Sequence, residues 1–198
     1  MKTMKFILAT LLLGMTISVA AQNKEWMKDA KKEEKRLTKE GWKITPGGIP
    51  MLQQILNSYK LRNELGMDLT PQYVFGNAQS LGQFIDAAKV AADGVSKADL
   101  VGQISPEITR LVSEQISTKQ LSNDQAESVM GVVEKSKSIV TQKLGIITPV
   151  IQFYRKLPNG TYEVMMSIAY DREKITNISK DTVNGMMKEA GLDIEVMQ

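Results

Sequence analysis

The clearest pattern of apolar and polar positions along the chain lies between residues 146 and 170, and it predicts a β-hairpin. Two runs rich in β-branched and aromatic residues, 150–154 and 162–168, flank the tetrapeptide Leu-Pro-Asn-Gly at 157–160. Proline presets φ at the second turn position and glycine accepts a positive φ, which is typical of a type I turn closed by a glycine bulge. We expect the hairpin to be the centre of the sheet.

The register of this turn decides which side chains face each other. It places Arg155 opposite Glu163 and Phe153 opposite Met165. Both faces of the hairpin are apolar, one through Tyr154, Val164, Met166 and Ile168, the other through Ile151, Phe153 and Met165. Such a hairpin needs a second cover, either a helix of its own chain or a partner protein.

Helical spacing of apolar residues predicts several helices. The first, residues 23–40, is densely charged, and Gly41 is placed to end it. We interpret it as a solvated helix that leans on the domain through Trp26 and Leu37; the alternative is a basic arm for anionic lipid or polymer. A loop over 41–48 follows, then a helix over 51–65 with core positions at Ile55, Leu56, Tyr59 and Leu65.

Residues 73–80 predict a short strand with Gly76 inside it, which indicates a bulge or a close backbone approach. Residues 83–103 predict a helix rich in alanine that lies close on the sheet. The positions expected to face inward are Phe84, Ala88, Ala91, Val95 and Ala98. A row of alternating charge, expected on a solvated face rather than in a catalytic carboxylate pair, comprises Asp86, Lys89, Asp93 and Lys97.

Three further segments are less clear. The tripeptide Ser105-Pro106-Glu107 is expected to interrupt the helix, and residues 108–116 fit a new helix or a strand. Ser122 and Gln125 form a capping box for a helix to about residue 137, and 139–144 is ambiguous between helix and strand. The inward positions expected there are Ala126, Val129, Met130 and Val133.

The C-terminal part of the chain predicts one more helix. Asp171 is expected to cap it, Gly191 is expected to end it, and residues 192–198 read as an edge strand or a tail. The positions expected to face inward are Ile175, Ile178, Met186 and Ala190.

Residues 1–21 have the composition of a secretory signal peptide: Lys2 and Lys5, an apolar run, and the small residues Val-Ala-Ala before Gln22. Removing the two lysines leaves 23 basic and 22 acidic residues, so the net charge falls from +3 to +1. This balance does not favour nucleic-acid binding. The expected organisation is a signal peptide over 1–21, a charged helix and linker over 22–48, and a single α+β domain over 49–198. No transmembrane segment is expected in the mature chain.

The 198 residues include no cysteine and no histidine. Disulfides, lipidation at a cleavage-site cysteine, histidine-based triads and zinc sites built from cysteine or histidine are therefore excluded. We predict no catalytic, cofactor-binding or metal-ligating residue, and no cofactor. The glycosylation triplets at 159–161, 177–179 and 181–183 are short patterns, and the sequence leaves their use open.

Two stretches support a resemblance to a known family. Phe75-Gly76-Asn77-Ala78, followed by Ala87-Ala88, Ala91-Ala92 and Gly102-Gln103-Ile104, resembles the LPP-twenty-like lipoprotein family and the N-terminal domain of a flagellar T-ring protein. The hairpin from Phe153 to Tyr170 resembles that of uncharacterised secreted relatives. The resemblance implies a non-enzymatic α+β envelope domain with a strand over 104–116. Pro106 and the missing lipidation cysteine depart from the family.

These observations predict an α+β fold with an antiparallel sheet of three to five strands, helices packed on it and a charged N-terminal helix. The expected function is that of an exported, non-enzymatic envelope protein, periplasmic, outer-envelope associated or secreted, which acts through binding or assembly. Its partner would be an unknown envelope protein or a second copy. The alternatives are a periplasmic hydrolase that uses two carboxylates and a small-ligand carrier.

Overall fold

The computed structural model describes residues 24–116 and 123–190. They form an α+β fold in which five helices accompany one antiparallel four-stranded sheet of order β1-β3-β4-β2. A helix over residues 24–39 comes first and the other elements follow in chain order. Their bounds are β1 Lys43–Ile44, α2 Met51–Asn63, β2 Tyr73–Gly82, α3 Ile85–Ile116, α4 Asn123–Lys143, β3 Ile151–Lys156, β4 Tyr162–Asp171 and α5 Arg172–Glu189.

The predicted hairpin is confirmed as β3 and β4, together with its turn and its register. The Gly160 N–H donates to the Leu157 carbonyl at 2.9 Å, and Gly160 has a φ of +87°. Arg155 pairs with Glu163 and Phe153 pairs with Met165, as expected. The expected sheet of three to five strands is confirmed with four.

Each face of the sheet is covered by helices of the same chain. Of the two covers considered for the second apolar face of the hairpin, a helix of the chain itself or a partner protein, the structure has the first. On one face, Val164, Met166 and Ile168 join buried residues of α3, α4 and α5 in a cluster that we call the sheet–arm core. On the other face, Phe153 packs with Trp42, Ile55 and residues of helix 24–39 in a second cluster that we call the N-terminal core.

The charged helix over residues 24–39 leans on this second face through Leu37, as predicted, and through fully buried Ala30. Trp26, the other predicted contact, is partly exposed and does not belong to this cluster. It ends in a Schellman motif at Gly41, whose φ is +85°: the Gly41 N–H donates to the Thr38 carbonyl and the Trp42 N–H donates to the Leu37 carbonyl. The loop predicted over 41–48 holds the short strand β1, which pairs with β3.

Gly76 marks a close approach between β2 and α3, as predicted. A Cβ atom at this position would lie 1.9 Å from the Ser96 carbonyl oxygen and 2.7 Å from the Leu100 Cβ. The residues of α3 that meet the sheet are Ala88, Ala92, Ser96 and Leu100, all fully buried. Three of these four side chains are small, and this lets the helix lie against a strand backbone.

The predicted inward face of α3 was wrong except for Ala88. Phe84, which precedes the helix, and Val95 are 70% and 49% exposed, and Ala91 and Ala98 are exposed as well. Hydrophobicity favoured these positions, whereas the sheet is met by the row through Ala88, Ala92 and Ser96, whose small side chains allow the close contact at Gly76. Ser96 is accepted in the buried row because its hydroxyl donates to the Asp93 carbonyl.

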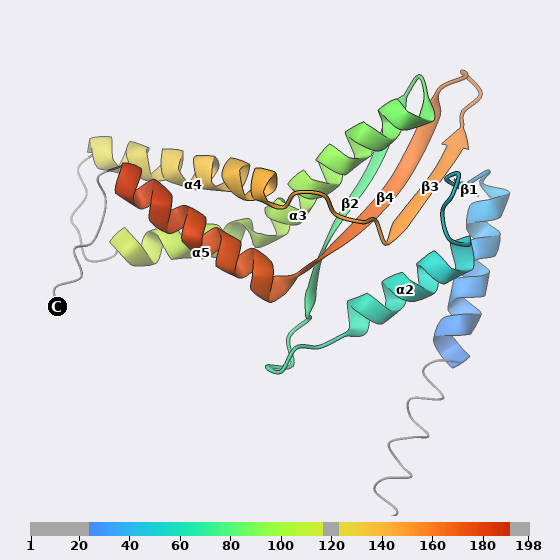
Figure 1. Ribbon diagram of the computed structural model, residues 1–198, viewed down its shortest axis with the longest axis horizontal. Helices are drawn as coiled ribbons and strands as arrows, with labels where there is room; N and C mark the ends of the chain where they lie inside the picture. The colour runs from blue at the N-terminus through green and yellow to red at the C-terminus, as the bar shows by residue number, and fades with distance from the viewer. Residues whose placement is uncertain (1–23, 117–122, 191–198) are drawn as a thin grey trace, which may run out of the picture.

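The predicted interruption at Ser105-Pro106-Glu107 was also wrong, because Pro106 lies inside the continuous helix α3. The strand that the family resemblance implied over 104–116 is helix too. Proline deprives the carbonyl four residues earlier of its donor and bends a helix without ending it. Figure 1 shows α3 changing direction partway along its length, so its C-terminal part turns toward α4 and α5.

Several smaller expectations are corrected in the same way. Residues 139–143, which the sequence left open between helix and strand, belong to helix α4. Val132, Ser136 and Val140 form the buried row of α4, while Met130 is 72% exposed; Val129 and Val133 are partly buried. Leu65 and Ala190, both expected inside, are exposed. The capping-box residue Ser122, the side chain of Ala126 and residues 191–198 lie outside the described parts.

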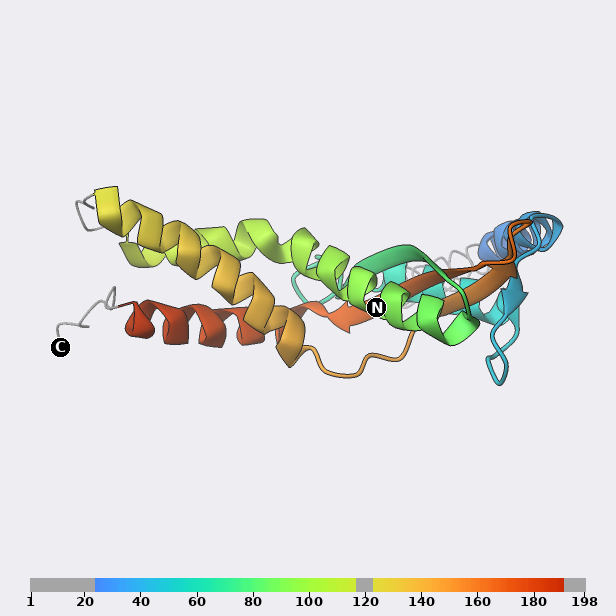
Figure 2. The ribbon, with the colours of Figure 1, turned by 90° about the horizontal axis from the view of Figure 1, so that it is seen from above.

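The remaining helix, α5, begins where it was predicted to begin. Asp171 caps it by accepting the Lys174 N–H at 2.9 Å. The C-terminal part of α3, α4 and α5 pack together as an arm that extends away from the sheet, which we call the helical arm (Figures 1 and 2). The molecule is therefore elongated, with the sheet and α2 toward one end and the helical arm at the other.

Candidate functional site

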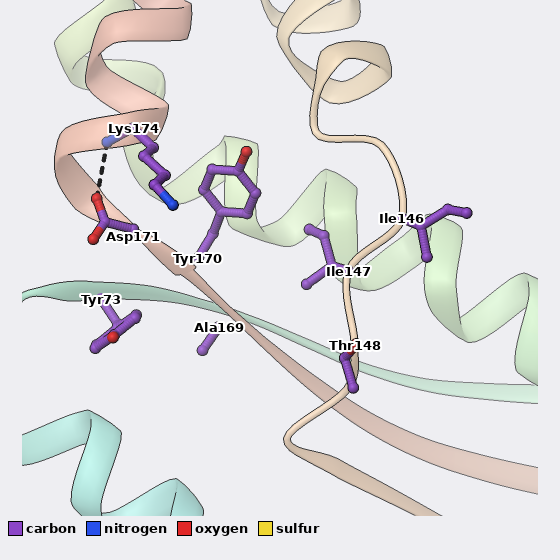
Figure 3. A pocket seen from close by; sticks show the side chains of 8 residues that line it. All are labelled: Tyr73, Ile146, Ile147, Thr148, Ala169, Tyr170, Asp171 and Lys174. Atoms are coloured by element: carbon purple, nitrogen blue, oxygen red, sulfur yellow. Dashed lines mark hydrogen bonds between the residues drawn. The ribbon is translucent and has the colours of Figure 1, made fainter.

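One hollow lies where β4 ends and α5 begins, opposite the loop that leads from α4 to β3 (Figure 3). Its volume is about 380 Å³, and Figure 3 shows Tyr170 and Lys174 on the same side of β4 as Ile147. The residues that line it are Tyr73, Ile146, Ile147, Thr148, Ala169, Tyr170, Asp171 and Lys174. The size fits a small ligand, and the lining is mixed aromatic, aliphatic and charged.

The chemistry of this hollow does not match a carboxylate-dependent hydrolase. Such an enzyme needs two acids about 5–10 Å apart across the bond that breaks. Asp171 is the only acidic residue in the lining, and its carboxylate already accepts the Lys174 N–H as the cap of α5. The hollow therefore lacks the second carboxylate that the reaction requires.

A second hollow of about 330 Å³ lies between α4 and α5 in the helical arm. It is lined by Gly131, Val132, Lys135, Met186, Glu189 and Ala190. It too offers a single acid. Among residues 24–116 and 123–190, no group of three or more acidic side chains is arranged to hold a metal ion.

Arg62 forms a small polar cluster on the other face of the sheet. Its guanidinium lies 4.0 Å from the centre of the Phe75 ring and donates to Asn77 Oδ1 and Ser58 Oγ. Burial lowers the pKa of Arg62 from its ordinary value. These contacts account for the cation through packing and hydrogen bonds, and the cluster holds no nucleophile or acid.

One surface feature is apolar and lies on the outward side of α3. Phe84, Val90 and Val95 are 70%, 75% and 49% exposed. Exposed small residues continue the same surface along the first part of the helix, namely Ala87, Ala91, Gly94 and Ala98. We call this set the α3 outer face. Contiguous exposed apolar surface of this kind is typical of protein–protein contacts.

Sequence reasoning named four of these residues but assigned them to the core. Phe84, Ala91, Val95 and Ala98 repeat at helical spacing, which is the signature of a helix face that is covered by something. The signal was correct about an apolar face and wrong about its location, because α3 carries a second apolar row at 88, 92, 96 and 100 that meets the sheet. Only one of two apolar faces can be covered by the sheet.

No family model, curated protein or solved structure matches the chain. The resemblance to the LPP-twenty-like family therefore remains an expectation from the sequence, and the strand it implied over 104–116 is absent because those residues are helical. In the described part of the chain, none of the helices combines the length and the apolar character needed to cross a membrane.

Proposed function

We propose that this chain is an exported, non-enzymatic envelope protein that acts through binding or assembly. The observation that carries the proposal is the α3 outer face, where three large apolar side chains are about half exposed or more. Water-exposed apolar surface is costly, and burying it on a partner is favourable by about 25 cal/mol per Å². The hollows, by contrast, bring no catalytic pair together.

Export is supported by the composition of residues 1–21, which carry a basic start, an apolar run and small residues before Gln22. We expect the full chain, expressed in a Gram-negative host, to appear in the envelope or medium fraction with Gln22 as its first residue. A matched chain lacking residues 2–21 should stay in the cytoplasm. Intact-mass measurement of each fraction distinguishes the two. A full chain that keeps Met1 and stays cytoplasmic would contradict the export part of the proposal.

Binding or assembly is tested separately, on the exported protein in its own compartment. A photo-crosslinking residue at Val90, on the α3 outer face, should give discrete adducts, whereas the same residue at exposed Lys60 of α2 should give fewer. Absence of adducts at Val90 would contradict assembly. The size of each adduct shows whether the partner is another protein or a second copy.

A further inference from the structure

We infer that the partner of the α3 outer face is a second copy of this chain, packed antiparallel about a two-fold axis at Ala91. This inference rests on the proposed function and specifies its partner. Three observations support it: the absence of charge on the face, the symmetry of its spacing, and the match between large and small side chains.

The charged residues of the first part of α3 lie off this face and are satisfied within the chain. Lys97 Nζ lies 2.7 Å from Asp93 Oδ2, and Lys89 Nζ lies 3.9 Å from Asp86 Oδ1. The Asp99 carboxylate accepts the Asn77 N–H of the edge strand β2 at 2.8 Å. A second copy could therefore cover the face without burying an unpaired charge or placing like charges together.

The spacing of the face is symmetric about its middle. Phe84, Ala87, Ala91, Val95 and Ala98 follow one another at intervals of three, four, four and three residues. A two-fold interface brings the same surface of both copies together, so a helix face that reads alike in both directions can pair with itself antiparallel. Only the axis at Ala91 satisfies this symmetry for all five positions.

The same axis sets large side chains against small ones. Phe84 of one copy lies opposite Ala98 of the other, Val95 lies opposite Ala87, and Ala91 lies opposite itself. Small residues at the crossing let two helices approach to about 8 Å between axes. A parallel pairing in register would instead set Phe84 against Phe84 and Val95 against Val95, which leaves the alanines apart.

The area of this face limits the strength of the dimer. The stripe from 84 to 98 is about 21 Å long and about 10 Å wide, whereas stable complexes bury about 800 Å² on each partner. Val90, which is 75% exposed, enlarges the contact at its margin. We therefore expect a dimer with a dissociation constant in the micromolar range, in exchange with monomer.

Because the chain has no cysteine, single cysteines can map the pairing without background. Under mild oxidation, the mature protein carrying Ala91→Cys should form a disulfide-linked homodimer, since the two Cα atoms meet at the axis. Ala98→Cys alone should not, but mixed with Phe84→Cys it should give a heterodimer. Lys60→Cys on α2 is the control for random collision. Dimers are counted on non-reducing gels and by intact mass.

Sedimentation equilibrium supplies the second measurement. We expect Ala91→Glu to weaken the dimer at least about tenfold, because each copy would bury a carboxylate against its twin, while Lys60→Glu should leave the dimer unchanged. Because Ala91 and Lys60 are both exposed, we expect both variants to fold, and circular dichroism checks this.

Four outcomes would overturn this inference. They are a protein monomeric at hundreds of micromolar, an Ala91→Cys dimer no more abundant than the Lys60→Cys control, an Ala98→Cys homodimer that indicates parallel pairing, and adducts at Val90 whose mass is that of another protein. The last outcome leaves the proposed function intact. Failure of the proposed function is recognised independently, by retention of the full chain in the cytoplasm or by the absence of any adduct at Val90.

Discussion

At the scale of single residues, the contact between β2 and α3 depends on the absence of a side chain at Gly76. The position where its Cβ would stand is 1.9 Å from a helix carbonyl oxygen, which belongs to backbone and cannot rotate away. Substitution there must push α3 off the sheet. The gap would open in the sheet–arm core, where Ala88 and Ala92 are fully buried.

We predict that Gly76→Ala lowers the free energy of unfolding by about 3 kcal/mol, at the upper end for overpacked cores. Urea unfolding followed by circular dichroism measures the change. Gly94→Ala on the exposed side of α3 is the matched control, since no atom lies within 4 Å of its added Cβ. It should raise stability by up to about 1 kcal/mol through helix propensity. Equal effects of the two substitutions would contradict the close contact.

Ser136 is the second residue whose environment makes a sharp prediction. Its hydroxyl is fully buried in the helical arm and has no hydrogen-bond partner among the described residues. A buried polar group without a partner costs about 1–3 kcal/mol. We therefore expect Ser136→Ala to increase the free energy of unfolding by about 1 kcal/mol.

The control for Ser136 is Ser179, a buried serine of α5 whose hydroxyl donates to the Ile175 carbonyl at 2.8 Å. Ser179→Ala removes a satisfied group, so the gain in stability should be smaller. Both variants are compared with the wild type by urea unfolding. A loss of stability in Ser136→Ala would mean that this hydroxyl makes a favourable contact in solution.

At the scale of elements, Arg155 ties the hairpin to the N-terminal helix. Its guanidinium lies 4.5 Å from the centre of the Trp42 ring, pairs with Glu163 at 2.7 Å and donates to the Glu40 carbonyl at the end of helix 24–39. The side chain of Glu163 is only 13% exposed, so solvent screens this ion pair less than a surface pair. One arginine therefore joins β3, β4 and the first helix.

We expect a coupling free energy of about 1 kcal/mol between Arg155 and Glu163, at the upper end for partly exposed pairs. A double-mutant cycle with Arg155→Met and Glu163→Gln, measured by urea unfolding, gives this value. The control cycle uses the ion pair between Glu134 and Lys137 of α4. The side chain of Glu134 is 74% exposed. That pair should couple by less than about 0.5 kcal/mol. Equal coupling in both cycles would contradict the role of burial.

At the scale of the whole molecule, α3 connects the two ends. Its first part covers the sheet and its last part packs in the helical arm, within one continuous helix of 32 residues. Neither end can lose its packing without disturbing the helix that both share. The elongated shape in Figures 1 and 2 is therefore compatible with a single cooperative unit.

We predict that urea unfolding gives one transition by two probes that report on different ends. Fluorescence reports mainly Trp42, which is buried in the N-terminal core, whereas circular dichroism reports mainly the helices of the arm and α3. Coincident curves are the test of two-state behaviour. Ile108 is fully buried in the arm, and Ile108→Ala should lower the free energy of unfolding by about 2–5 kcal/mol. The urea midpoints of both probes should fall together. Separate midpoints would show that the ends unfold independently.

Local chemistry allowed several features to be predicted from the sequence. The turn at 157–160, the register of Phe153 with Met165, the cap at Asp171 and the helix end at Gly41 all depend on residues close in the chain, whose preferred φ values and hydrogen bonds need no distant partner. The fold class followed from these elements. For the candidate site, the sequence already contained the apolar repeat at 84, 91, 95 and 98.

Other features depended on what lies opposite each element, which periodicity does not contain. α3 has two apolar rows, and the backbone contact at Gly76 selected the smaller one for the sheet and left Phe84 and Val95 in solvent. Pro106 removes one hydrogen bond, yet packing with α4 and α5 keeps the bent helix intact. By itself, the sequence determined the hairpin, the helix ends at Gly41 and Asp171 and the fold class, because these depend on residues close in the chain. Tertiary structure alone decided that α3 continues past Pro106 and which face of each helix is buried, because both depend on the fit between surfaces distant in the chain.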